Sequence, residues 1–122
     1  RWMRALWRSR RGRLSSQVLT EFYNVATRRL KPGLLVADAR DEVREFYAWR
    51  PVVLSAEVIE GAFVLAERFR VSFWDALILA AARAASCAHV LTEDLQDGQD
   101  FGGMTAVNPF RHDPSELGLE ES

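Results

Sequence analysis

The chain has 122 residues and a mass of 13.9 kDa, which suits one domain. Hydrophobic residues make up 48% and charged residues 27%, with a formal net charge of -1, so wholesale disorder is not expected. The longest apolar run, residues 76–82, is far shorter than the roughly 20 residues that span a bilayer. The arginine-rich start lacks the pattern of a secretory signal, and a single cysteine, Cys87, cannot form an internal disulfide. We therefore expect a cytoplasmic protein that does not enter the membrane.

Charge is distributed unevenly along the chain. Residues 1–31 hold nine basic residues against one acid, whereas residues 93–122 hold eight acids against Arg111. A basic face attracts a polyanion such as RNA, and an acidic face attracts cations or a basic partner. The candidate RNA-binding residues are Arg8, Arg10, Arg11 and Arg13. The alternative is a solvated helix surface followed by a frayed acidic tail.

The first half of the chain predicts helices separated by short extended steps. Residues 2–7 have the spacing of the end of a helix, and Leu14 is a short extended step. Ser16 is placed to cap a helix over residues 16–30, which stops at Pro32-Gly33. The amphipathic pattern returns over residues 36–49, and residues 51–54 form a brief β-type run.

The second half predicts two more helices and two strands. Residues 55–69 carry a strong helical stripe that starts at Ser55, and Ser72 opens a helix with Asp75 at capping-box spacing. Residues 76–82 are apolar on every side, so this helix should be buried. Residues 89–91 and 105–110 predict short buried strands.

Short apolar strands that alternate with amphipathic helices predict an α/β domain with a mostly parallel sheet. The pattern yields few strands, and a central strand is expected to be missing. We expect the domain over residues 1–115 and a loose acidic tail over residues 116–122.

Three acidic residues are candidates for catalysis or metal binding. Ligands of open α/β sheets bind beyond the carboxyl ends of the strands, where Asp94 follows one predicted strand, Asp75 opens the buried helix and Glu21 follows Leu14. Hard divalent cations prefer carboxylate oxygens, and phosphodiester hydrolysis uses such a cation to activate water. Each acid also has a plain structural explanation, as a helix cap, an edge charge or a turn residue.

Four blocks of sequence, in order, resemble PIN-domain ribonucleases of the VapC toxin type. They are LSSQVLTEFY (residues 14–23), SFWDALI (72–78), VLTEDLQDGQ (90–99) and VNPF (107–110). The resemblance implies a three-layer α/β/α fold around a parallel sheet. It also implies a metal-dependent endoribonuclease that acts as the toxin of a type II toxin–antitoxin pair, with an antitoxin partner and a homodimer.

The resemblance assigns roles residue by residue. Glu21, Asp75 and Asp94 match the acids that hold Mg²⁺ or Mn²⁺ and activate water, and Asp97 is a weaker candidate for the metal. Thr92 matches a hydroxyl that orients a carboxylate. Family members begin with a strand that ends in a metal-binding Asp, and nothing before Trp2 supplies it. The resemblance therefore predicts a domain without its first strand, with low activity. The alternative function is an inactive PIN domain that binds antitoxin or RNA without cleaving.

The remaining chemistry-bearing residues have simpler expected roles. The two histidines, His89 and His112, lie in no setting that suggests a nucleophilic triad. We expect Trp49 and Trp74 to pack in the interior, and Trp2 and Trp7, among arginines, to contact RNA or a partner.

Overall fold

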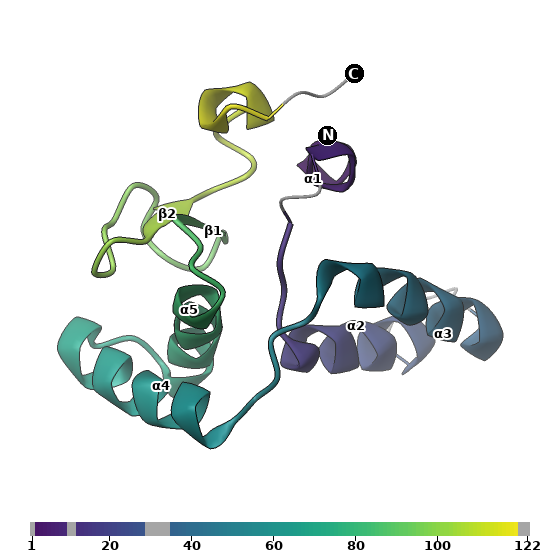
Figure 1. The fold of residues 1–122 in the computed structure, drawn as a ribbon, viewed down its shortest axis with the longest axis horizontal. Helices are drawn as coiled ribbons and strands as arrows, with labels where there is room; N and C mark the ends of the chain where they lie inside the picture. Colours follow the sequence, from purple (N-terminus) through teal and green to yellow (C-terminus); the bar gives the residue numbers. More distant parts are fainter. Residues whose placement is uncertain (1, 10–11, 29–34, 120–122) are drawn as a thin grey trace.

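The computed structural model describes residues 2–9, 12–28 and 35–119 (Figure 1). These residues form, in chain order, α1 (Trp2–Ser9), α2 (Ser16–Arg28), α3 (Val36–Glu45), the 3-10 helix η1 (Phe46–Trp49), α4 (Ala56–Phe69), α5 (Phe73–Ala84), β1 (His89–Leu91), β2 (Thr105–Val107) and the 3-10 helix η2 (Pro114–Leu117). The helix starts at Ser55 and Ser72, the strand at residues 89–91 and the α/β class are confirmed. The cap predicted at Ser16 is one residue earlier, because the hydroxyl of Ser15 accepts the backbone N–H of Val18 at 3.3 Å and Ser16 is the first residue of α2.

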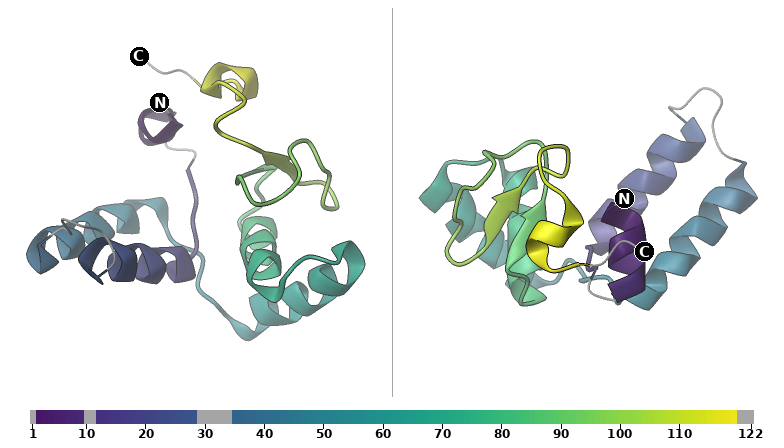
Figure 2. Two further views of the ribbon diagram at one scale, coloured as in Figure 1. Left: turned by 180° about the vertical axis from the view of Figure 1, so that it is seen from behind. Right: turned by 90° about the horizontal axis from the view of Figure 1, so that it is seen from above.

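The largest core lies between α4, α5 and the sheet (Figure 2). In α4 the residues Val58, Ala62 and Leu65 recur at helical spacing and are buried. α5 is buried at Ala76, Leu77 and Leu79–Ala81 because it lies between α4 and the strands, as its apolar composition predicts. The ring of Phe101, from the segment between the strands, meets Phe69 edge-on at 5.1 Å between centroids and closes this core.

The sheet of the described residues has two parallel strands, β1 and β2, with His89 opposite Thr105 and Leu91 opposite Val107. The extended segments predicted at Leu14 and residues 51–54 also pair in parallel, as an isolated bridge between Ser15 and Val52. Val52 N–H donates to the carbonyl of Leu14 at 2.8 Å, and Ser16 N–H donates to the carbonyl of Val52 at 2.9 Å. The predicted parallel pairing is thus present in two separate places.

α2 and α3 pack against each other on one side of the molecule, away from the core of α4 and α5 (Figures 1 and 2). The predicted single helix over residues 36–49 is divided, since the last turn tightens into η1. Arg50 then takes a left-handed conformation, with φ of 50°, and ends the helix. The ring of Trp49 lies edge-on to Phe46 at 4.9 Å and is buried, as predicted.

Two further predictions need correction. The strand predicted over residues 105–110 ends at Val107, because the next residues fold into a turn in which Arg111 N–H donates to the carbonyl of Asn108 at 3.0 Å. Trp74 does not pack in the interior: it is 46% exposed. It lies in the first turn of α5, ahead of the buried positions that begin at Ala76.

The C-terminal segment lies beside α1 (Figure 1). The indole N–H of Trp2 donates to the carbonyls of Pro109 at 2.9 Å and His112 at 3.2 Å. A loose tail is predicted from Glu116, whereas Glu116 and Leu117 belong to η2 and Leu119 is buried. Residues 120–122 lie outside the described residues.

Candidate active site

Asp75 is held at the start of α5 by a helix cap. Ser72 has extended backbone angles, and its hydroxyl accepts the backbone N–H of Asp75 at 3.1 Å. The Asp75 side chain is partly exposed in this first turn. The positive end of the helix dipole lies at this first turn and attracts negative charge.

Asp94 follows the carboxyl end of β1. The hydroxyl of Thr92 accepts the backbone N–H of Asp94 at 3.1 Å, and Thr92 N–H donates to the carbonyl of Val107 at 3.0 Å. Thr92 therefore fixes the main chain of Asp94. Its predicted role toward a carboxylate stays a prediction. Asp94 itself is exposed beyond the edge of the sheet.

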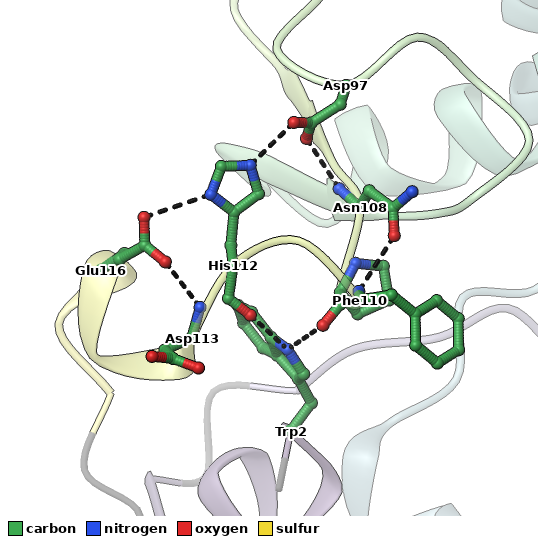
Figure 3. A network of polar contacts seen from close by, with 8 residues as sticks. Trp2, Asp97, Asn108, Phe110, His112, Asp113 and Glu116 are labelled. Atoms are coloured by element: carbon green, nitrogen blue, oxygen red, sulfur yellow. Dashed lines mark hydrogen bonds and ion pairs between the residues drawn. The ribbon is translucent and has the colours of Figure 1, made fainter.

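Asp97 has both carboxylate oxygens engaged in hydrogen bonds (Figure 3). Oδ1 accepts the backbone N–H of Asn108 at 2.8 Å, and Oδ2 lies 2.7 Å from Nε2 of His112. These two hydrogen bonds, the Asn108 N–H first, hold the pKa of Asp97 below its ordinary value. The carboxylate thus joins the loop after β1 to the segment after β2.

His112 is a residue whose role the sequence did not reveal. Its Nδ1 lies 3.1 Å from Oε1 of Glu116, so both ring nitrogens face carboxylates. The hydrogen bonds to Asp97 and then Glu116 raise the pKa of His112, because the imidazolium can donate both. Glu116 also accepts the backbone N–H of Asp113 at 2.6 Å, which is the main reason that its own pKa is lowered. The sequence could have indicated only the contact between His112 and Glu116, because residues four apart lie on the same side of a helical turn.

The other predicted residues lie on the N-terminal side of the chain. Glu21 is part of α2, but its side chain and that of Arg8 lie outside the description, as do Arg10 and Arg11 altogether. Arg13 donates from Nε to the carbonyl of Trp49 at 3.0 Å and from Nη2 to the carbonyl of Arg50 at 2.8 Å. Arg13 therefore fastens the segment before α2 to the end of η1.

The carboxylates have the right chemistry for a hard cation, but the described side chains do not assemble its site. Among them, no three His, Cys, Asp or Glu residues form a group able to hold a metal ion. Both carboxylate oxygens of Asp97 are already engaged, one with the backbone N–H of Asn108 and the other with the ring of His112. The fit to a metal ion is incomplete, and we assign no reaction step to one.

Comparison of the sequence with known protein families identifies the family of this chain. The family model of the PIN domain matches residues 1–96, which include α1 to β1 and the candidates Glu21, Asp75 and Asp94. The chain belongs to the PIN domain family. PIN domains are α/β proteins that are generally metal-dependent nucleases and typically bind divalent metal ions. The search of curated proteins returned no match.

The PIN match ends just before Asp97, so the His112 cluster lies outside the matched region. In the part of the chain that the structure describes, no helix is long and apolar enough to cross a membrane.

Proposed function

We propose that this PIN domain is an endoribonuclease, the toxin of a toxin–antitoxin pair. The observation that carries the proposal is the family match over residues 1–96, which includes both Asp75 and Asp94. Asp75 lies in the capped first turn of α5, and Asp94 lies beyond the end of β1. Both positions are typical of the carboxyl edge where α/β domains bind ligands.

The proposal includes the cofactor and partners that the resemblance implies. The cofactor is Mg²⁺ or Mn²⁺, the substrate is RNA, and the partners are a cognate antitoxin and a second copy of the chain in the cytoplasm. The general metal dependence of PIN domains supports the cofactor. The uneven charge, with basic residues gathered before Lys31, supports a polyanionic substrate.

We also propose that the complete domain has three layers with a central strand between β1 and the segment at Leu14. A groove of about 580 Å³ is lined by Leu14 and Val52 of these extended segments and by Val90 and Leu91 of β1. Ile78 and Ala82 of α5 also line it, as does Leu6 of α1. An extended apolar segment suits such a groove, because parallel strands are buried on both faces.

The test of the activity is cleavage of single-stranded RNA in the presence of Mg²⁺ by the parent and by Asp75→Asn. A matched control is Asp38→Asn, because Asp38 occupies the same position in the first turn of α3, three residues after its N-cap. We expect Asp75→Asn to lose cleavage by a factor of at least about 100, as for removal of a group that acts directly in catalysis. Asp38→Asn should cleave like the parent.

Two outcomes contradict the proposal. Equal cleavage by Asp75→Asn and the parent shows that Asp75 is not part of the active site. A parent that binds RNA or an antitoxin without cleaving identifies the alternative, an inactive PIN domain that acts by binding. EDTA treatment of an active parent, followed by return of Mg²⁺ or Mn²⁺, tests the cofactor separately.

A further inference from the structure

A surface hollow of about 430 Å³ lies between the start of α1 and the segment after β2. Trp2, Pro109, Phe110 and Arg111 line it, together with the cluster around His112. It lies outside the stretch that carries Asp75 and Asp94, and apart from Trp2 its lining residues follow the region matched by the PIN family. Most of the hollow therefore lies beyond the region matched by the PIN family and apart from the candidate acids.

Phe110 is the unusual residue of this hollow, because its side chain is 81% exposed. Its backbone N–H donates to Oδ1 of Asn108 at 2.9 Å, in the same turn in which Arg111 N–H donates to the Asn108 carbonyl. Figure 3 shows the ring directed away from the His112 cluster. An exposed ring adds little to folding, yet this one is presented on a turn fixed by hydrogen bonds.

The same turn is fixed from two further directions. Trp2 donates its indole N–H to the carbonyls of Pro109 and His112, which sets the position of the indole at the hollow (Figure 3). The side chain of His112 is held by Asp97 and Glu116. The indole of Trp2 and the backbone that carries Phe110 are therefore preorganised, which lowers the entropy lost when a ligand binds.

The strand register brings this turn to the edge of the sheet that carries Asp94. β1 and β2 are parallel, and Leu91 pairs with Val107. Asp94 lies three residues after Leu91, and Phe110 lies three residues after Val107, so both follow the same carboxyl edge. A strand of RNA that contacts this edge near Asp94 can extend toward Phe110.

We propose that the hollow binds an unpaired nucleobase of a single-stranded RNA, with the base stacked on Phe110 beside Trp2 and the neighbouring phosphate at Arg111. This inference rests on the proposed function and adds to it a base-binding site apart from Asp75 and Asp94. Aromatic platforms beside cationic side chains are the usual means of binding single strands. Asp113 and Glu116 also line the hollow and disfavour a phosphate next to them, which leaves the Arg111 side for the backbone.

The test is the affinity of the full chain for a fluorescein-labelled oligoadenylate, measured by anisotropy in EDTA so that no cleavage occurs. Phe110→Ala should bind at least about five-fold more weakly, since loss of one stacking contact has an effect of that size or larger. Phe110→Trp should restore the affinity. Tyr47→Ala is the matched control, because Tyr47 is an aromatic residue that is 61% exposed on η1 and does not line the hollow.

Arg111→Gln tests the phosphate contact independently. Its affinity should fall less steeply with salt than that of the parent, by about 0.7 in the slope of log affinity against log salt. Thermal unfolding of each variant separates a loss of binding from a loss of folding. Parental affinity in folded Phe110→Ala, together with a parental salt slope in Arg111→Gln, overturns the proposal.

Failure of this inference and failure of the proposed function have different signatures. A parent that cleaves RNA, with Phe110→Ala binding as tightly as the parent, leaves the nuclease standing and removes the base site. A parent that binds in a Phe110-dependent way without cleaving keeps the base site and removes the nuclease. If Phe110→Ala changes only the sedimentation mass, the hollow is a protein contact and the RNA proposal is wrong.

Discussion

His112 Nε2 lies 2.7 Å from Oδ2 of Asp97, and this contact joins the C-terminal segment to the loop after β1. The two residues are 15 positions apart in the chain, and the parallel pairing of β1 with β2 brings their segments together. On its other side His112 meets Glu116 of η2 at 3.1 Å. A single imidazole thus connects the loop after β1 and η2.

Stability should depend on pH through this cluster. The raised pKa of His112 means that its contribution is complete below its unfolded value, about 6.5, and is lost as the pH rises through the folded pKa. The lowered pKa values of Asp97 and Glu116 mean that their contribution is present above their unfolded values and is lost as the pH falls. The cluster therefore stabilises the fold most between roughly pH 5 and 6.5.

Thermal unfolding across pH checks this expectation. The Tm difference between the parent and His112→Gln should be largest in that window and should shrink above it. His89→Gln, at the exposed start of β1, is the control and should show no such maximum. A Tm difference for His112→Gln that does not change with pH contradicts the role assigned to the ion pairs.

Ser72 should stabilise α5 through its cap. Ser72→Ala removes the acceptor for the Asp75 N–H and should lower the free energy of unfolding by about 0.5–2 kcal/mol. Ser72→Thr keeps a hydroxyl and should retain most of that stability. Urea unfolding of the three proteins measures the effect, and equal loss in both variants would show that the hydroxyl is not the stabilising group.

The core between α4 and α5 can be tested with two neighbouring residues. Leu65 is 1% exposed and Val64, beside it in the chain, is 63% exposed. Leu65→Ala leaves a cavity and should cost about 2–5 kcal/mol, whereas Val64→Ala should change stability by less than about 0.5 kcal/mol. Urea unfolding measures both, and a similar loss at the two positions would contradict the placement of α4 on the core.

Local signals in the sequence predicted much of the fold. Ser55 and Ser72 cap α4 and α5 as predicted, because a cap depends on residues within one turn. The strand at residues 89–91 was also correct. The exposure of Trp74 was not predicted, since its helical face was read from spacing alone and it precedes the buried part of α5.

The site was less accessible to sequence reasoning. The positions of Asp75 and Asp94 follow from a helix start and a strand end, which are local features. The cluster of Asp97, His112 and Glu116 depends on the register of β1 with β2, and no local pattern encodes that register. The turn that exposes Phe110 depends on the same pairing. Family resemblance identified the candidate acids, but it did not indicate which carboxylates other side chains already hold.

Two glycines offer a test of packing with opposite expected signs. A Cβ added to Gly12 would lie 2.7 Å from the Cζ3 atom of Trp49, closer than real Cβ contacts, and the buried indole has Phe46 against its edge. Gly12→Ala should therefore destabilise the fold by about 1–3 kcal/mol. Gly61 lies within α4, and a Cβ added there would lie 3.7 Å from the Cβ of Ala80 in α5, an ordinary contact between the two helices. Gly61→Ala should stabilise by about 0.5–1 kcal/mol, because alanine loses less backbone entropy in a helix. Urea unfolding measures both, and a Gly12→Ala protein as stable as the parent would show that Trp49 does not close on the segment before α2.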